Sequence, residues 1–570
     1  MTPPPGEPWS SAGFLPLAAL WLALTWRLRR PGLLLAGVLL ANAWVWAVTI
    51  LPLQRPYGFG SSRDRLNNAA MIAVVAGEGR PLETIQVGQL HFEPLWHGLV
   101  GLLSGGQPGR VPGLLHLFSL LTPLAFALAV FFGLRRALPD EEGAWERAVV
   151  AFFATLLASA PREFLGSYRP PWAAMFLLKP NHALGLCLLP LVLLAVAAAR
   201  GWRSRIAAGL LLHLLGWVFV LHMAYVVAGL ALFALLSWLE RRPERDREAL
   251  DVAVVVGVNL LVVSPYLFML LRGYPFLQAL PRHTIPPFSP HLIEGTLAGG
   301  GLLLAAAAWG GRVLWARGDR LSRLWLAQAL AALVLWASHI LLSALHHARE
   351  RDESYQWLRF LMAVLAGIGA WDLVRRGLGG AATKWRELLA PGRGHADSPW
   401  QPAARAACLC LVLLPSSLPA WWQPKSMDPY FAASLRPLPE ALVAPGEWLL
   451  RHSRPGEVVA GDHDYAVWAA ALSGRRVLLS SRFHRPAGSA QRLALERGLL
   501  RGDAPAPAQA LAASLGVRYL VVTQHLLWRQ GISLESLLAR RDLEVGYLAP
   551  ARVRSNEPLA VFRLRSEAVR

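Results

Sequence analysis

Long apolar segments alternate with short polar segments over residues 1–424 of the chain. A helix needs roughly 20 mostly apolar residues to cross the hydrocarbon layer of a membrane. The stretch at 206–239 is too long for one such helix and predicts two, with a turn near Val220–His222. The other segments of sufficient length lie at about 11–26, 31–53, 111–134, 145–160, 182–199, 250–271, 292–316, 322–347, 357–374 and 403–422. The pattern therefore predicts an α-helical polytopic membrane bundle with about twelve spans.

The pattern changes after residue 424, where the apolar runs become short and are separated by glycine and proline. Two runs have helical spacing, Ala466–Leu472 and Ala506–Leu515. Other runs have the length and composition of strands, namely Glu457–Ala460, Arg476–Ser480, Tyr519–Thr523 and Ala560–Leu564. Residues 425–570 are therefore predicted to form a soluble α/β domain that follows a transmembrane domain over 1–424.

Basic residues are gathered in short clusters between the apolar segments. When the predicted spans are counted alternately, these clusters all fall on one side, which the positive-inside rule makes the cytoplasmic side. This topology places the polar loop at 54–110 and the C-terminal domain on the outer face of the membrane. The clusters are Arg27/Arg29/Arg30, Arg135/Arg136, Arg200/Arg203/Arg205, Arg241/Arg242/Arg245/Arg247, Arg317/Arg320/Arg323 and the arginines between Arg375 and Arg405.

Composition supports the membrane class, because 55% of the residues are hydrophobic and only 16% are charged. The formal net charge of +20 raises the question of nucleic-acid binding. The arginines are spread among the loops between apolar segments, where they contact lipid headgroups and orient the spans. We therefore expect membrane lipid as a partner and no nucleic acid.

The outer loop at 54–110 is the most polar part of the predicted membrane domain. Within it, a helical apolar stripe predicts a short amphipathic helix lying on the membrane surface. Asp64 stands between Arg63 and Arg65 directly before that stripe, and a charge at the membrane boundary is costly to hold without a function. The stripe consists of Leu66, Ala69, Ala70, Ala73, Val74 and Gly77.

Three roles are open for Asp64. It could act as a general base, help to hold a divalent cation such as Mg²⁺ or Mn²⁺, or cap a helix that starts at Leu66. Arg63 and Arg65 would lower the pKa of its carboxyl group and could contact a lipid phosphate. The first loop is therefore where we expect the chemistry.

Further polar clusters lie at the predicted outer ends of spans. His91, Glu93 and His97 could bind a metal or relay protons, or they could be polar anchors at the membrane interface. A second cluster suits a phosphate or a sugar, although its lysine could equally snorkel; it consists of Lys179, Asn181 and His182. A third cluster holds His346, Arg349 and Arg359. Arg359 lies a short way into the next span, where a charge needs a partner, and that partner is either a lipid-linked phosphate or a carboxylate such as Glu353. In the C-terminal domain, Asp462-His463-Asp464 has the composition of a metal-binding triplet, but we favour a strand-to-helix turn with a carboxylate cap.

The layout of these features resembles the GT-C class of integral-membrane glycosyltransferases. The matching pattern is a span, the acidic residue Asp64 in the first large outer loop, and an amphipathic helix that ends in Gly77–Pro81. Pro94-Leu95-Trp96-His97 follows, a late span opens with Arg359-Phe360, and the C-terminal domain contains Gly516–Val522. The sequence departs from the class in two ways: Asp64 has no adjacent second carboxylate, and an extra span precedes the usual first one.

The resemblance implies a bacterial plasma-membrane enzyme that uses a polyprenyl-phosphate sugar as donor. Asp64 would be the catalytic acid of the class, with Glu93 as a candidate second acid. The carrier phosphate would be neutralised by Arg63, Arg65, Lys179 and Arg359. The acceptor is unknown. Two other functions remain as alternatives, a lipid or polysaccharide transporter and a structural protein of the cell envelope, although no internal repeat supports the transporter.

Overall fold

The computed structural model describes most of the middle and the C-terminal part of the chain. The predicted spans at 11–26, 31–53 and 403–422 lie wholly or mostly outside the described residues. So do Lys179, His346, Arg349 and Arg359. The described ranges are 63–91, 93–139, 141–159, 180–273, 291–344, 357–358, 360–376, 439–481, 488–550 and 557–565, with short stretches between 24 and 37 and at 486, 554 and 555.

The chain divides into two compact units. The helical unit comprises Met1–Pro52, Phe118–Val263 and Arg282–Phe431, and the sheet unit comprises Leu53–Leu117, Ser264–Pro281 and Ala432–Arg570. The outer loop predicted at 54–110 thus belongs to the same unit as the C-terminal segment. The domain boundary at residue 424 stays a prediction.

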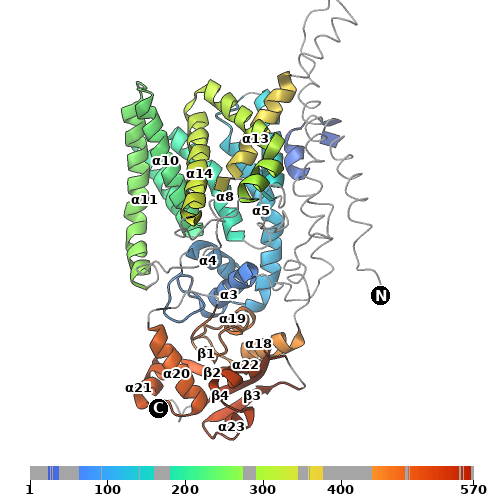
Figure 1. Cartoon of the computed structure of the whole chain (residues 1–570), viewed down its shortest axis with the longest axis vertical. Helices are drawn as coiled ribbons and strands as arrows, with labels where there is room; N and C mark the ends of the chain where they lie inside the picture. Colours follow the sequence, from blue (N-terminus) through green and yellow to red (C-terminus); the bar gives the residue numbers. More distant parts are fainter. Residues whose placement is uncertain are drawn as a thin grey trace, which may run out of the picture. The chain divides into compact units, whose positions relative to one another are not determined.

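Helices of the helical unit coincide with the apolar segments of the sequence (Figure 1). Four helical stretches are long and apolar enough to cross a membrane among the described residues: Asn181–Ala198, Val220–Leu239, Arg245–Leu270 and Arg320–Ser338. A bent pair, Pro108–Phe118 and Leu120–Gly133, forms a fifth such segment with a 43° bend. The elements of this unit are α6 (Glu141–Ser159), α8 (Pro180–Ala198), α9 (Trp202–Val218), α10 (Val220–Leu239), α13 (His291–Arg317), α14 (Arg320–Ala344) and a helix at 360–376, together with the greater parts of α5 (Val111–Gly133) and α11 (Arg245–Gly273).

The predicted break within 206–239 is present. Phe219 separates α9 from α10 and has extended backbone angles, φ −158° and ψ 103°. The break comes just before the predicted turn at Val220–His222. The two helices contact each other directly, so one long apolar stretch folds back as a hairpin.

Close backbone approach builds the core of the helical unit. A Cβ atom at Gly310 of α13 would lie 1.9 Å from the Leu365 carbonyl oxygen, and one at Gly369 would lie 1.9 Å from that of Ala306. Small residues of this kind let membrane helices pack backbone to backbone. Trp325, Trp357 and Trp371 fill the neighbouring space and are almost fully buried.

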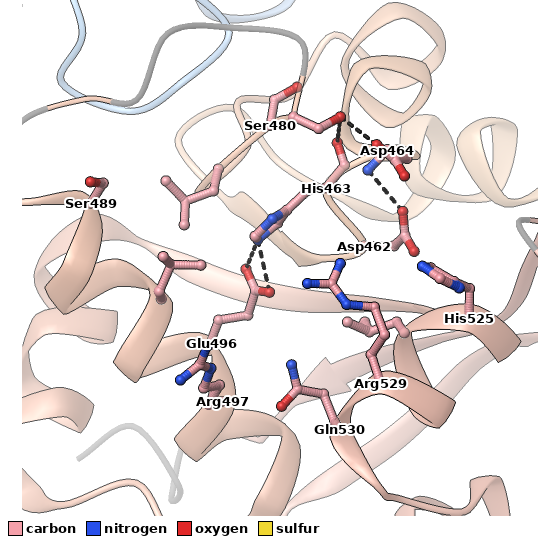
Figure 2. A pocket seen from close by; sticks show the side chains of 14 residues that line it. Asp462, His463, Asp464, Ser480, Ser489, Glu496, Arg497, His525, Arg529 and Gln530 are labelled. Atoms are coloured by element: carbon pink, nitrogen blue, oxygen red, sulfur yellow. Dashed lines mark hydrogen bonds and ion pairs between the residues drawn. The ribbon is translucent and has the colours of Figure 1, made fainter. Parts of the chain in front are cut away.

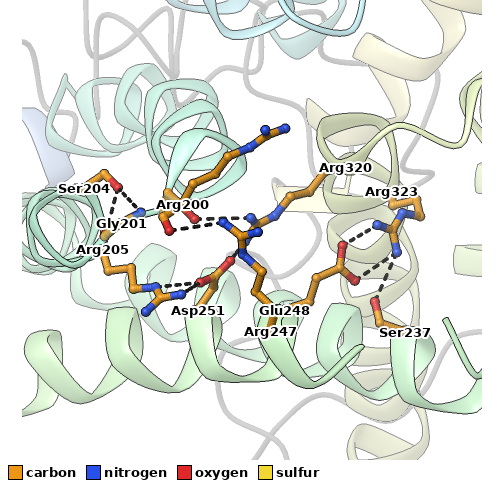
Figure 3. Close-up of polar contacts among 11 residues, drawn as sticks. Arg200, Gly201, Ser204, Arg205, Ser237, Arg247, Glu248, Asp251, Arg320 and Arg323 are labelled. Atoms are coloured by element: carbon orange, nitrogen blue, oxygen red, sulfur yellow. Dashed lines mark hydrogen bonds and ion pairs between the residues drawn. The ribbon is translucent and has the colours of Figure 1, made fainter. Parts of the chain in front are cut away.

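Buried ion pairs tie three helices together at one end of the helical unit (Figure 3). The Asp251 carboxylate of α11 receives Arg205 of α9 and Arg320 of α14, each at 2.6 Å. Arg323 of α14 pairs with Glu248, one turn before Asp251 on α11. The Asp251 side chain is fully buried, so its two arginines supply the charge compensation that burial requires.

A mixed sheet organises the C-terminal part of the sheet unit. Its strand order is β1-β2-β4-β3, with β1 and β2 parallel and the other neighbours antiparallel. Helices α20 (Ser489–Arg501) and α21 (Ala506–Leu515) pack against β1 and β2, while α18 (Glu440–His452) packs against β3 and β4. The strands are β1 (Val458–Gly461), β2 (Val517–Thr523), β3 (Leu543–Leu548) and β4 (Pro558–Leu564).

Two strand expectations need correction. The predicted strand at Arg476–Ser480 does not form; Val477 makes only isolated bridges, to Gln86 and Val459. Conversely, β3 was not expected, because its alternating pattern includes Gly546 and Tyr547 on a half-exposed edge. The helices predicted at Ala466–Leu472 and Ala506–Leu515 are confirmed as α19 (Ala466–Ser473) and α21.

The helix predicted in the first loop is α3 (Arg63–Glu78), but its apolar stripe is covered by protein rather than by lipid. It packs against α19 and against α4 (Pro94–Leu103). A Cβ atom at Gly77 would lie 2.4 Å from the Gly474 carbonyl oxygen, so the two helix ends meet through glycine. An apolar stripe in the sequence does not show whether the helix is covered by lipid or by protein.

Candidate active site in the first loop

Asp64 is the second residue of α3. The helix begins at Arg63, so Asp64 lies inside the first turn instead of capping a helix that starts at Leu66. The side chains of Arg63, Asp64 and Arg65 are outside the described residues. Their catalytic and phosphate-binding roles therefore stay predictions, while the backbone that carries them is part of the sheet unit.

His97 ties α4 to α3 one turn after Asp64. Its Nε2 lies 2.6 Å from Asn68 Oδ1, and its Nδ1 lies 3.1 Å from the Glu93 carbonyl oxygen. Positions 64 and 68 share a face of α3 because they are four residues apart. Burial lowers the pKa of His97 to about 4, although the hydrogen bond to Glu93 partly opposes this. The ring is therefore neutral at neutral pH, and its single N–H can donate to only one of these two oxygens; the contact with Asn68 nevertheless braces α4 against α3.

His91 packs beside this brace. Its ring centroid lies 4.4 Å from that of His97, and its Nδ1 accepts the Glu93 backbone N–H at 2.7 Å. Burial, with a further contribution from His97, holds the pKa of His91 well below its usual value. The hydroxyl of Tyr266, also in the sheet unit, donates to the His91 carbonyl oxygen. The structure thus brings the predicted set of His91, Glu93 and His97 together. The two histidine rings are neutral, and both contact the backbone of Glu93.

A metal site is not formed by these residues. No group of three His, Cys, Asp or Glu side chains suited to a metal ion occurs among the described residues. The expectation of a divalent cation consequently rests on Asp64, whose side chain is not described.

The end of the first loop is held by two arginines that follow α19. Arg476 lies between Glu83, at 2.8 Å, and Glu78, at 3.3 Å. Arg475 donates to the Gly77 carbonyl oxygen at 3.3 Å and to that of Ser453 at 2.9 Å. Sequence reasoning missed both arginines, and the Gly474-Arg475-Arg476 sequence carries no signal of a partner almost 400 positions away.

Two further bonds fix residues 86 and 87. The Gln86 side-chain oxygen accepts the backbone N–H of Ser480 at 3.1 Å, and Arg492 of α20 donates to the Val87 carbonyl oxygen at 2.8 Å. Gln86 also donates to Gln89 at 2.8 Å. The segment after α3 is therefore bound to the C-terminal elements by a continuous series of hydrogen bonds, which positions α3 and its first turn.

The helical unit contains a second group of predicted residues. Asn181 and His182, at the start of α8, are both buried. The His182 ring lies 3.7 Å from that of Phe219 and 6.0 Å from that of His222, which sequence reasoning did not single out. Trp357 lies 5.0 Å from His222, two positions before Arg359. The extended Phe219 backbone brings His222 to this cluster.

Comparison with known proteins identifies solved structures that have a similar architecture. No protein-family model matches the sequence, and no curated protein matches it. Among solved structures, ArnT from Cupriavidus metallidurans in the apo state is 14% identical, with 94% of this chain and 99% of that chain covered and a TM-score of 0.53. The archaeal oligosaccharyltransferase AglB from Archaeoglobus fulgidus, in complex with an inhibitory peptide and a dolichol-phosphate, is also 14% identical, with 94% and 76% covered and a TM-score of 0.50.

The chain has the GT-C fold of these membrane proteins. The fold that the short motifs implied is thereby confirmed over nearly the whole chain. The sequence identity of 14% is too low to transfer a substrate or the roles of individual residues from these proteins. Its apolar helices are those of a membrane protein.

Proposed function

We propose that this protein is a membrane glycosyltransferase that moves a sugar from a polyprenyl-phosphate carrier to an acceptor on the outer face of the bacterial plasma membrane. The shared fold carries the proposal, since it covers 94% of this chain in both comparisons. The AglB structure holds a dolichol-phosphate and a peptide, which supports a lipid-linked donor here. The acceptor is not specified by these observations.

Asp64 is the proposed general base. It takes the proton of the acceptor hydroxyl or amine as that atom attacks the anomeric carbon, and the bond from this carbon to the carrier phosphate breaks with its electron pair on the phosphate oxygen. A single displacement of this kind inverts the anomeric centre. The Asn68–His97 contact at 2.6 Å braces the turn of α3 that follows Asp64, which favours a fixed position for the base.

Cations near the membrane boundary are proposed to neutralise the phosphate as it leaves. Arg63 and Arg65 flank the base, and Lys179 and Arg359 come from other outer ends of spans. Asn181 and His182 supply hydrogen-bonding groups for the sugar, as His346 and Arg349 do for the lipid-linked group. Glu93 is proposed as a second acid.

The proposal also includes the membrane topology predicted from the sequence. About twelve spans would cross the membrane by the length rule, with the basic clusters on the cytoplasmic side. The C-terminal α/β segment would then lie outside. Its hydrogen bonds to residues 77–87 support this, since both parts of the sheet unit must be on one side of the membrane.

The deciding experiment is Asp64→Asn in the purified full-length protein, assayed for release of polyprenyl phosphate from polyprenyl-phosphate sugars. Asp503→Asn is the matched control, because Asp503 is an exposed aspartate of the same unit. We expect turnover to fall by about 100-fold or more in Asp64→Asn, as for loss of a general base, with an unchanged melting temperature. Full turnover in this variant would move the base elsewhere, and a wild-type protein that releases nothing from any donor would favour the transporter.

A further inference from the structure

A polar cavity of about 300 Å³ lies within the C-terminal part of the sheet unit (Figure 2). It opens where β1 and β2 end, at Asp462 and just past Thr523, and helices α20 and α22 (Gln524–Gln530) form its other walls. Because β1 and β2 are parallel, their carboxyl ends meet at one edge of the sheet, the usual place for a ligand in such folds. None of the residues proposed to act on the donor lines this cavity.

The acidic groups of the cavity are engaged within the protein. Asp462 accepts the backbone N–H groups of Asp464 and Tyr465 at 2.9 Å and the Thr523 hydroxyl at 2.6 Å. The expected strand-to-helix turn is thus confirmed, with the Asp462 carboxylate bonded to backbone N–H groups of the turn, whereas α19 itself begins after Tyr465 without a side-chain cap. The Asp464 carboxylate accepts the Ser481 hydroxyl.

A half-buried histidine and a buried glutamate line the cavity and contact each other. His463 Nε2 lies 3.0 Å from the Glu496 carboxylate, whose side chain is only 5% exposed. Burial lowers the pKa of His463, but the hydrogen bond and the charge of Glu496 outweigh this and raise it. Burial also raises the pKa of Glu496, and the two side chains are bound to each other.

The rim supplies cations that remain available. Arg497 of α20 and Arg529 of α22 line the cavity, are exposed, and make no side-chain hydrogen bond or ion pair among the described residues. Both guanidinium groups are drawn around the His463–Glu496 pair in Figure 2. With the carboxylates engaged, the charge left for a ligand is positive, and guanidinium groups bind phosphate and carboxylate in preference to other groups.

Neutral hydrogen-bonding groups complete the lining. Gln530 and Ser489 offer donors and acceptors, and His525 also lines the cavity. Next to the rim, Trp528 is 79% exposed, and its ring lies 6.2 Å from that of His525. Mixed donors and acceptors suit hydroxyl groups, and an exposed indole offers a flat face for an apolar ring surface. The volume is at the small end of ligand cavities, which corresponds to a single sugar unit.

We infer that this cavity binds a sugar unit that carries a negative charge, as a phosphate or a carboxylate group. Arg497 and Arg529 contact the anionic group, while Gln530 and Ser489 bind the hydroxyl groups. The cavity is a glycan-binding site in addition to the proposed transferase site, and its occupancy does not require a donor.

The test is direct binding by calorimetry to the purified full-length protein with no donor present. The probes are glucuronic acid, glucose 1-phosphate, glucose and inorganic phosphate. The variant is Arg497→Gln/Arg529→Gln, and the control is Arg541→Gln, an exposed arginine of the same unit that does not line the cavity. We expect at least one anionic sugar to bind, at least about tenfold more tightly than glucose and inorganic phosphate, and the double variant to lose about tenfold or more in Kd.

Several results would overturn the inference. They are no binding of either anionic sugar to the wild-type protein at millimolar concentration, unchanged binding by the double variant, or glucose or inorganic phosphate binding as tightly as the tighter of the two anionic sugars. If the double variant melts early, the single variants Arg497→Gln and Arg529→Gln replace it, since both positions are exposed. Failure here leaves the turnover test of Asp64 untouched, because no donor is used.

Discussion

Arg476 and Glu83 form an ion pair of 2.8 Å across 393 positions of sequence. The same guanidinium lies 3.3 Å from Glu78, and the side chains of Arg476 and Glu78 are 7% and 2% exposed. A pair this well buried differs from a surface ion pair, because removal of one partner leaves a desolvated charge. The pairing joins the first loop to the segment after α19 and makes the two a single folding unit.

Replacing Arg476 tests this directly. We expect Arg476→Met to lower the free energy of unfolding by about 3 kcal/mol, since Glu78 stays buried without a cation. The control is Arg451→Gln, which removes an exposed pair with Glu447 and should cost less than about 1 kcal/mol. Thermal unfolding followed by near-UV circular dichroism measures both, and equal effects in the two variants would contradict the assigned burial.

The contact of Gly77 with Gly474 leads to a second prediction. Gly474 has φ +68°, and a Cβ atom there would lie 2.4 Å from Pro108 and 2.7 Å from the Ala73 carbonyl oxygen. Gly474→Ala therefore combines backbone strain with a steric clash and should cost about 3 kcal/mol.

Gly531→Ala isolates the backbone contribution to that effect. Gly531 has φ +65° with nothing within 4 Å of the added atom, so we expect a cost of only about 1 kcal/mol. Comparing the melting temperatures of the two variants separates the clash from the strain. A Gly474 variant no less stable than the Gly531 variant would mean that α3 and α19 are not in close contact.

The brace at His97 predicts a pH dependence. Its folded-state pKa of about 4 lies below the unfolded value of 6.5, so the unfolded chain binds more protons in between. Stability should therefore fall as pH drops from 6.5 toward 4, with His97 contributing a loss of about 2 kcal/mol by pH 5. His91 adds to this in the same direction.

Unfolding of the wild-type protein and of His97→Gln, each at pH 7.5 and pH 5, measures this contribution. The variant should be the less stable protein at pH 7.5, because it loses the brace to Asn68. Its stability should also decline less on acidification. An identical decline in both proteins would show that His97 is not held neutral by burial.

Asp251 gives the corresponding prediction for the helical unit. Asp251→Asn leaves Arg205 and Arg320 without their shared carboxylate and should cost about 3 kcal/mol. Asp246→Asn is the matched control, because Asp246 precedes it on the same helix and its side chain is 88% exposed. Heating in detergent with detection of aggregation ranks the variants, and a control as unstable as Asp251→Asn would rule out a special role for the buried pair.

The sequence pattern predicts the helices well and their surroundings poorly. Apolar length alone located α8, α10, α11 and α14, because a membrane-spanning helix must satisfy every backbone group within itself. The same pattern could not show that the stripe on α3 faces α19, since lipid and a protein core select the same side chains.

Residues brought together over long sequence distances account for what was missed at the candidate site. Arg475, Arg476 and Arg492 hold residues 77–87, but each stands in a locally ordinary sequence. Val477 resembles a strand residue because it is apolar and buried, yet it bridges only single residues on either side. The turn at Asp462 was predicted correctly, because an aspartate that bonds to the backbone of its own turn is a local feature of the sequence.

The discontinuous make-up of the sheet unit has a consequence for biosynthesis. Its early part, Leu53–Leu117, leaves the ribosome more than 300 residues before the Gly474–Arg476 segment. Until that segment arrives, Glu78 lacks its buried arginine, Glu83 has only the exposed Arg80 as a counter-charge, and α19 does not yet cover the apolar stripe of α3. The first loop can thus complete its folding only when translation is nearly complete. A chain that ends before residue 474 would insert its membrane helices, but its first loop would not fold completely.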